Sequence, residues 1–442
     1  MHREIIFLLL LQILNIFGQN NDSLGKNIHV YLNSTNEIRM KTPANVTLTI
    51  VSDEETIDED FIFECSDTYL CTVYNDSKIK HVSLNKENNY TTNMIVDIDP
   101  TFLGVTRINI EPVENGSKFN ISYTSNMKIH KTKSGQVWEY AFSIVVTYFI
   151  TFVTFLMGTQ LHVNVILNIL KKPIGPIVSI ICQFLFMPLV AYGLCLTVLK
   201  DEPNFVKFCF IAAGSSPGGG KSSFWTIIFD GNLNLSVCLT FVQTVCASLM
   251  MPLWMTLIGK QFLANENISV PYIGLVKAIF NLIIPCIVGM LTVHYKPKLV
   301  QNAQKYIKVA TWTSTIVFTM LGVFVYHHIF LMITLPILIA SCILPWSGYI
   351  LAYIVGTLCK LPIADVITVS IETGVQNVGL AIMMLMYSFQ EPELDIAMVA
   401  PIVVILATDK PLIIIWLIKK MYKKYCSSDN DKKDNISLPR TG

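Results

Sequence analysis

Two short polar segments interrupt apolar stretches that would otherwise be long enough to cross a membrane. The first runs from Ser216 to Ser223 and contains Pro217 and three consecutive glycines, and the second runs from Glu372 to Asn377. Backbone that leaves the helix at bilayer depth is tolerated only where protein or a water-lined cavity satisfies its hydrogen bonds. Two interrupted spans in one chain are typical of secondary transporters, in which solute and ions bind at the breaks. The two segments therefore predict a substrate and ion site.

The composition places most of the chain in lipid. Hydrophobic residues make up 52% of the 442 residues and charged residues only 14%, whereas soluble domains carry about 25% charged residues. The net charge of +1 provides no global basic field, and lysines cluster beside the hydrophobic stretches instead. We therefore expect the lipid bilayer as a partner and no interaction with nucleic acid.

The N-terminus has the pattern of a signal peptide. Arg3 precedes an apolar run from Ile5 to Ile16, and a small-residue cleavage pattern follows near Gly18. The alternative is a first transmembrane helix, but the run is shorter than the roughly 20 residues that a bilayer requires. We predict a signal peptide over residues 1–18.

Residues 19–135 are polar and turn-rich and predict an extracellular domain. Short alternating β-branched segments favour a small β-sandwich, with strands at 45–51, 94–98, 105–110 and 118–123. Cys65 and Cys71 are the only cysteines before the first span, and in an oxidising compartment we expect them to pair. Seven N-x-S/T sequons predict glycosylation, at Asn21, Asn33, Asn45, Asn75, Asn89, Asn115 and Asn120.

The remaining chain predicts a polytopic α-helical transmembrane domain over residues 136–420 and a cytoplasmic tail over residues 421–442. Nine hydrophobic segments lie at about 138–158, 174–199, 204–229, 232–258, 271–293, 308–327, 329–358, 361–388 and 396–418. The third and eighth contain the breaks. With the N-terminus outside, nine spans place the C-terminus in the cytoplasm, and the lysines of the predicted inner loops and tail agree with this orientation. We expect a multi-pass protein of the plasma membrane.

Glu372 is the most informative single residue. An ionisable group deep inside a long apolar segment costs about 2.5 kcal/mol or more on insertion scales, so it requires a cationic partner or a proton. Ser236 and Thr240 are four residues apart, which places both hydroxyls on one helix face. Alone, such a pair more often joins helices by hydrogen bonds, and a protonated Glu372 between helices is the alternative. Together, the three residues favour a site for a monovalent cation.

Several motifs between about residues 137 and 420 resemble the sodium/bile acid cotransporters of solute carrier family ten. The matching segments are Gln183 to Leu189, Ser216 to Gly219, Gly231 to Ser236 with Thr240, Met250 to Leu253, and Glu372 to Asn377. The glycosylated β-rich extension is similar to that of the family's orphan branch, more than to that of its short bile acid carriers.

The resemblance implies a core bundle and a panel of helices, with the two broken helices crossing near the midplane beside two Na+ sites. One site would be lined by Ser222, Ser223, Ser236, Thr240 and Glu372, and the other by Gln183, Glu372 and Gln376. Break residues beside the substrate would be Pro217, Gly218, Gly219, Lys221 and Asn377. An amphipathic organic anion such as a bile acid or sulfated steroid would move inward, driven by the sodium gradient.

Two residues depart from the family pattern. Position 223 is usually asparagine in the sodium-coupled members, and Ser223 offers a shorter side chain with one fewer hydrogen-bonding group. Lys221 places an ammonium next to the first site. It either pairs with Glu372 in place of sodium, which predicts altered sodium coupling, or extends to an aqueous cavity without meeting the site.

The sequence thus predicts a secondary active transporter, a symporter, and no enzyme. His327 and His328 fall in a predicted loop without a companion carboxylate or cysteine pattern, so we expect solvated or interfacial histidines there. The alternative function is a non-transporting receptor or adhesion protein that uses residues 19–135 on a transporter-like scaffold. A receptor would tolerate loss of Glu372, whereas a carrier would not. The pattern leaves the substrate, the ion stoichiometry and the oligomeric state open.

Overall fold

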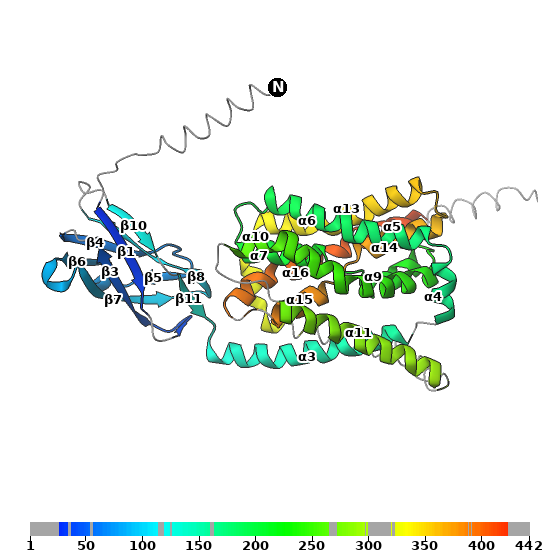
Figure 1. The fold of residues 1–442 in the computed structure, drawn as a ribbon, viewed down its shortest axis with the longest axis horizontal. Helices are drawn as coiled ribbons and strands as arrows, with labels where there is room; N and C mark the ends of the chain where they lie inside the picture. The colour runs from blue at the N-terminus through cyan, green and yellow to red at the C-terminus, as the bar shows by residue number, and fades with distance from the viewer. Residues whose placement is uncertain are drawn as a thin grey trace, which may run out of the picture. The chain divides into compact units, whose positions relative to one another are not determined.

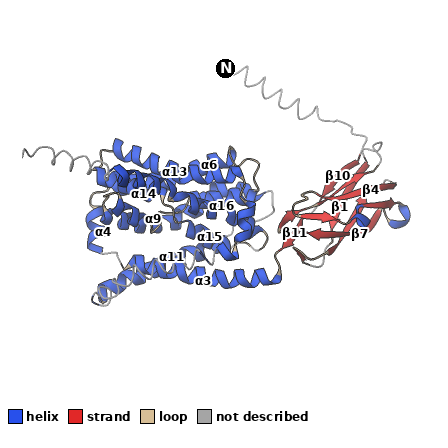
Figure 2. Ribbon diagram, turned by 180° about the vertical axis from the view of Figure 1, so that it is seen from behind, coloured by secondary structure: helices blue, strands red, loops and turns tan. Residues whose placement is uncertain are grey.

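The chain folds as two compact units, Met1–Thr132 and Lys133–Gly442. The computed structural model describes residues 26–33, 37–53, 56–113, 119–123, 126–159, 163–264, 272–296, 298, 320, 323–387, 389 and 391–422. Strands occur in the first unit, and the second is helical (Figure 2). The predicted signal peptide, the sequons at Asn21 and Asn115 and the tail beyond Tyr422 lie outside the described residues.

The described strands of the first unit form three sheets. The largest has the order β10-β1-β3-β7-β5, with β1 (Lys26–Leu32), β3 (Ala44–Ser52), β5 (Cys71–Val73), β7 (Thr91–Pro100) and β10 (Phe119–Tyr123). The second has the order β2-β11-β8, with β2 (Ile38–Arg39), β8 (Gly104–Thr106) and β11 (Met127–His130). The third has the order β6-β4-β9, with β4 (Ile57–Cys65), β6 (Ile79–Leu84) and β9 (Ile108–Pro112). Two single turns of helix, α2 (Asn75–Lys78) and η1 (Lys86–Asn88), connect strands.

Alternating apolar residues give these sheets one shared core. In β3 the side chains of Val46, Leu48 and Ile50 are buried, and the residues between them are more exposed. Side chains from all three sheets join the same cluster, among them Ile28, Phe63 and Ile129. The β-rich prediction is confirmed. However, the segment predicted as one strand at 105–110 is divided at Arg107 into β8 and β9, which belong to different sheets.

A histidine between two aspartates holds the edge strand β6 to β4. His81 Nδ1 lies 2.8 Å from Asp60 Oδ1, and His81 Nε2 lies 3.0 Å from Asp58 Oδ1. The hydrogen bonds to Asp60 and Asp58 raise the pKa of His81, and the hydrogen bond from His81 lowers the pKa of Asp58. Because a protonated imidazole donates from both nitrogens, the charged ring bridges both carboxylates.

The helical unit contains six described helices that are long and apolar enough to cross a membrane. They are Lys133–Leu156, Ile174–Leu196, Leu233–Leu263, Tyr272–Tyr295, Leu335–Leu358 and Glu393–Tyr422. Large apolar side chains such as Leu249, Leu257 and Ile273 are exposed on the bundle surface, as expected for a surface that faces lipid. The polytopic prediction is confirmed at this level. Most of the predicted span 308–327 lies outside the described residues.

The elements of this unit follow in chain order. They are α3 (Lys133–Gly158), α4 (Val163–Leu170), α5 (Ile174–Ile181), the π-helical η2 (Cys182–Phe186), α6 (Met187–Leu196), α7 (Asn204–Gly214), α8 (Ser222–Ile228), α9 (Leu233–Trp254), the π-helical η3 (Met255–Gly259), α10 (Lys260–Ala264), α11 (Tyr272–Tyr295), the 3-10 helix η4 (His327–Met332), α13 (Leu335–Leu358), α14 (Ile363–Gly374), α15 (Val378–Met386) and α16 (Glu393–Thr408). Helix α3 runs alongside α11 at one side of the bundle, while α13 packs against α14 and α7 against α16 (Figure 1).

Candidate functional site

Each of the two predicted breaks separates a pair of short helices. Between α7 and α8, Pro217 lacks the N–H that a helix needs, and the glycines that follow it each cost about 1 kcal/mol in a helix. The second break, between α14 and α15, consists of Val375, Gln376 and Asn377. The backbone of Val375 and Asn377 has left the helical region there, with ψ angles of 86° and 67°.

The two breaks are hydrogen-bonded to each other. Gly219 N donates to Val375 O at 2.7 Å, and Asn377 N donates to Pro217 O at 2.7 Å. Gly218 and Gln376 thereby form an isolated antiparallel bridge. Each break satisfies backbone groups that the other leaves without a helical partner, as buried backbone requires. The ends of four short helices therefore meet at one place.

The carboxylate of Glu372 lies beside this bridge in the last turn of α14 and is 0% exposed. Thr240 Oγ1 donates to Glu372 Oε1 at 2.5 Å, and Ser236 Oγ donates to Glu372 Oε2 at 3.1 Å. The hydroxyls of Ser223 and Ser222 lie 3.1 Å and 3.5 Å from Ser236 Oγ. The structure thus brings together the five side chains of the first predicted ion site. Within the described part of the chain, no basic side chain forms a salt bridge with Glu372.

Glycine is required at position 218 because the backbone touches the carboxylate. A Cβ added to Gly218 would lie 2.4 Å from Glu372 Oε1 and 2.7 Å from Gln243 Oε1. Gln243 is a site residue that the sequence analysis missed: its Oε1 accepts from Gly218 N at 2.6 Å, and its Nε2 donates to Ser179 Oγ at 2.7 Å. It lies three residues after Thr240, so the polar stripe of α9 was the available signal.

Gln183 contacts the first break, and Gln376 belongs to the second. Gln183 Nε2 donates to Ser216 O at 2.5 Å, while its Oε1 is buried without a hydrogen-bond partner among the described residues. Gln376 is 5% exposed, and its amide oxygen and nitrogen are also buried without a hydrogen-bond partner among the described residues. Such buried polar atoms are rare in proteins and need an explanation. They mark a polar space beside the second break.

Gln183 lies in the π-helical segment η2, and Pro188 explains why the helix widens there. Pro188 has no N–H, so the carbonyl of Phe184, four residues earlier, loses its usual helical donor. Trp254 Nε1 donates to this carbonyl at 2.6 Å instead. Wide turns of this kind occur frequently at functional sites. The shared Gln183 to Leu189 motif therefore shapes the backbone as well as supplying a side chain.

Lys221 does not pair with Glu372, so the first of the two alternatives for this residue is wrong. Its Nζ lies 2.8 Å from Asp409 Oδ2, and the lysine side chain is 52% exposed. Asp409, which the sequence analysis did not single out, also accepts from Trp225 Nε1 at 3.1 Å. The ammonium is therefore compensated by a carboxylate of the last span. An acidic residue inside an apolar stretch was the signal for it.

The second histidine of the pair at 327–328 is buried and has carboxylate neighbours, contrary to our expectation. His328 Nε2 lies 3.2 Å from Asp395 Oδ1. Oxygen atoms of Asp395, Glu139 and Glu391 all lie within 4.8 Å of one another, an arrangement that could hold a metal ion. Tyr326 OH donates to Glu139 Oε1 at 3.0 Å. These contacts join α3, η4 and α16 in one polar cluster.

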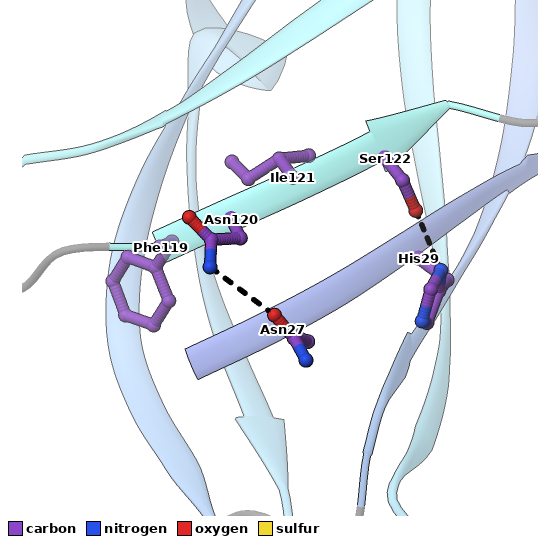
Figure 3. Close-up of a pocket in the computed structure, with 6 residues that line it drawn as sticks. All are labelled: Asn27, His29, Phe119, Asn120, Ile121 and Ser122. Carbon is purple, nitrogen blue, oxygen red and sulfur yellow. Dashed lines mark hydrogen bonds between the residues drawn. The ribbon is translucent and has the colours of Figure 1, made fainter. Parts of the chain in front are cut away.

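The first unit has a groove of about 530 Å³ along β1 and β10 (Figure 3). These strands pair in parallel with Asn27 opposite Asn120 and His29 opposite Ser122. Asn120 Nδ2 donates to Asn27 Oδ1 at 3.3 Å, and the Ser122 hydroxyl is hydrogen-bonded to His29 Nδ1. Asn120 is a sequon residue, so a glycan there would emerge at this groove.

Other predicted residues of the first unit are placed as follows. Cys65 and Cys71 form a disulfide with a Cα–Cα distance of 5.9 Å. The sequon asparagines that the structure describes are all exposed: Asn33, Asn45, Asn75, Asn89 and Asn120. Exposure is what a glycan acceptor requires.

Apolar spans, two mutually bonded breaks and a buried carboxylate between them define a class of protein, the multi-pass membrane transporters. Residues 147–335 match the model of the Sodium Bile acid symporter family. Over these residues the chain is similar to this family, which is a family of transporters and not of enzymes.

Three relatives illustrate the similarity. The ileal sodium/bile acid cotransporter of Homo sapiens is 29% identical over 263 residues, which are 59% of this chain and 74% of that protein. The P3 protein of Homo sapiens is 30% identical over 254 residues, 57% of this chain and 52% of that protein. The hepatic sodium/bile acid cotransporter of Rattus norvegicus is 28% identical over 272 residues, 61% of this chain and 75% of that protein. The first unit lies outside the part that matches the family model.

Proposed function

We propose that this transporter is a symporter that couples sodium entry to the uptake of an amphipathic organic anion, such as a bile acid or a sulfated steroid. The observation that carries the proposal is the buried carboxylate of Glu372, which faces hydroxyl groups and has no basic partner among the described residues. A buried charge of this kind is costly unless a counter-charge compensates it. A bound sodium ion supplies that charge.

The side chains around Glu372 fit a hard cation. Carboxylate and hydroxyl oxygens are the ligands that such ions prefer, and Ser222, Ser223, Ser236 and Thr240 present four hydroxyls within one network. Ser223 is shorter than the asparagine usual in the family, but its hydroxyl still reaches Ser236 at 3.1 Å. This contact supports retention of the first sodium site. Lys221 is paired with Asp409, so its ammonium does not take the place of sodium beside Glu372.

A second sodium ion fits beside Gln183 and Gln376. The Gln183 Oε1 atom and the amide of Gln376 are buried and lack partners among the described residues. An ion bound there would use these oxygens together with Glu372. The same ion would satisfy the two amide oxygens, each of which otherwise reduces stability by about 1–3 kcal/mol.

The organic anion would bind beside the breaks. Gly220 is exposed, and an added Cβ there would meet no atom within 4 Å, so the first break leaves open space at Gly220. The anion class comes from the relatives named as sodium/bile acid cotransporters. Sodium bound at α8, α9 and α14 would fix the geometry of this surface and so couple the two solutes.

We also propose that the first unit is extracellular and the tail cytoplasmic, in the plasma membrane. The exposed sequon asparagines, the Cys65–Cys71 disulfide and the signal-like N-terminus support this orientation. Lys419 and Lys420 at the end of the last span agree with the positive-inside rule.

The test is uptake of radiolabelled taurocholate and a sulfated steroid into cells that express the full chain, in sodium or in choline medium. Glu372→Gln should abolish sodium-dependent uptake at equal surface expression, since it removes the charge and keeps the shape. Asp201→Asn, which removes an exposed carboxylate elsewhere in the unit, is the matched control. Equal uptake by Glu372→Gln and wild type would contradict the proposal. Anion binding to the first unit without uptake would favour the receptor alternative.

A further inference from the structure

The half-helix α8 is held at both ends by residues of the last span. At its N-terminal end, Asp409 accepts from Lys221 Nζ at 2.8 Å and from Trp225 Nε1 at 3.1 Å. At its C-terminal end, Lys419 Nζ lies 2.6 Å from Asp230 Oδ2. Helix α8 has only seven residues, too few for a stable helix without tertiary contacts. Its position therefore depends on these attachments and on the packing between them.

The packing between the two ion pairs is apolar. Trp225 belongs to one cluster with Leu412 of the last span and with Ile371 and Val375 at the second break. The side chain whose indole N–H is bonded to Asp409 thus belongs to the same apolar cluster as the segment that carries Glu372. A shift of Trp225 would be transmitted to both breaks, because closely packed side chains do not deform independently.

Two side chains of α13 donate hydrogen bonds to the backbone just before Asp409. The regular part of α16 ends at Thr408, and Asp409 follows it. Trp346 Nε1 donates to Ala407 O at 3.1 Å, and Tyr349 OH donates to Thr408 O at 3.0 Å. The ring of Tyr349 lies against Gly374, where an added Cβ would be 2.2 Å from it. The carboxylate of Asp409 is thus fixed relative to the second break.

The charge of Lys221 explains why this carboxylate matters. Lys221 directly precedes Ser222 in the chain, so the two Cα atoms are about 3.8 Å apart. An unpaired ammonium on the residue next to a proposed ligand would oppose cation binding by Coulomb repulsion. In the structure, Asp409 compensates the ammonium at 2.8 Å.

We infer that Asp409 is a positioning residue for sodium binding. It fixes the start of α8, so that the hydroxyls of Ser222 and Ser223 reach Ser236, and it neutralises Lys221, so that the entering ion meets no unpaired positive charge. Asp409 is not itself an ion ligand. The inference rests on the proposed sodium site and adds a residue that lies outside it.

The test is the affinity of the purified full-length protein for radiolabelled sodium. Asp409→Asn should weaken the affinity about tenfold or more, because it leaves the ammonium next to the site without its counter-charge. Asp230→Asn is the matched control, since it removes the ion pair at the other end of α8. It should change the affinity by no more than about twofold, as is usual for an exposed pair. Asp409→Glu keeps the charge and should retain most of the affinity.

A double variant separates the effect of charge from a purely structural effect. Lys221→Met in the Asp409→Asn background should recover most of the lost affinity, although it removes one more contact. Thermal unfolding in choline chloride identifies any variant that is simply misfolded, and Asp409→Glu then serves as the comparison. If wild type binds sodium and Asp409→Asn behaves like Asp230→Asn, or if the double variant is no better than Asp409→Asn, the inference fails. Wild type without saturable sodium binding would instead refute the proposed function itself.

Discussion

Replacing Gly218 by alanine should weaken sodium binding, because the new methyl group would enter the space that Glu372 occupies. The added Cβ would lie 2.4 Å from Glu372 Oε1 and 2.7 Å from Gln243 Oε1, whereas real Cβ atoms essentially never come closer than 3.0 Å to another heavy atom. Neither oxygen is free to move. Glu372 Oε1 accepts from Thr240 at 2.5 Å, and Gln243 Oε1 accepts from Gly218 N itself at 2.6 Å.

The size of the effect follows from these contacts. Overpacking a tight interior costs about 1–3 kcal/mol, and losing a hydrogen bond to a charged group costs about 1.5–3 kcal/mol. Since 1.4 kcal/mol corresponds to a factor of ten, we expect the sodium affinity of Gly218→Ala to fall at least about tenfold. The backbone at this glycine is compatible with alanine, so the contact and not strain is being tested.

Gly220→Ala is a matched control within the same break, because its Cβ would meet no atom within 4 Å. The assay is the rise in melting temperature of the detergent-purified protein as sodium chloride replaces choline chloride at constant ionic strength. Gly220→Ala should keep the wild-type sodium dependence, and Gly218→Ala should require about ten times more sodium for the same rise. Identical sodium curves for the two variants would refute the close approach of this backbone to the ion site.

Three further predictions concern other parts of the chain. Gln243→Met should lower the free energy of unfolding by about 1–3 kcal/mol, because it leaves a buried N–H of the first break without an acceptor. Thr244→Val removes only a hydrogen bond within its own helix and should cost less. Thermal unfolding of the two variants compares these effects. Cys65→Ser should destabilise the first unit by about 2 kcal/mol, because the disulfide no longer closes the loop. Faster proteolysis in urea measures this. Cys359 is an exposed free cysteine, so Cys359→Ser should have no effect. Protonated His81 should stabilise the first unit below about pH 6.5, and this stabilisation should disappear as the pH rises through the raised pKa of His81. The ratio of hydrogen-exchange rates in β6 between His81→Gln and wild type, taken at equal pH, measures it. A ratio that does not change with pH would contradict the prediction.

The parts of the site that the sequence could predict are those set by local periodicity. Ser236 and Thr240 share a helix face because they are four residues apart, and Glu372 is conspicuous because it is charged within an apolar stretch. The breaks are visible because proline and glycine interrupt helices whatever surrounds them. These features need no knowledge of which helices are neighbours in space.

The parts that could not be predicted depend on contacts between distant segments. The partner of Lys221 is 188 residues away in the chain, so recognising Asp409 as this partner required the packing of α8 against the last span. Gln243 reads as one more polar residue on α9 until the backbone of Gly218 is placed beside it. The division of a predicted strand at Arg107 likewise follows from sheet pairing, which pattern alone does not specify.

Sodium-driven accumulation in proteoliposomes is the most direct test of symport by this protein. The purified protein is reconstituted, and uptake of radiolabelled taurocholate and a sulfated steroid is followed with an inward sodium gradient or with equal sodium on both sides. We predict that the transported anion accumulates above its external concentration only with the gradient, and that Glu372→Gln abolishes this accumulation. Accumulation of an anion that is independent of the gradient, or that persists in Glu372→Gln, would contradict it.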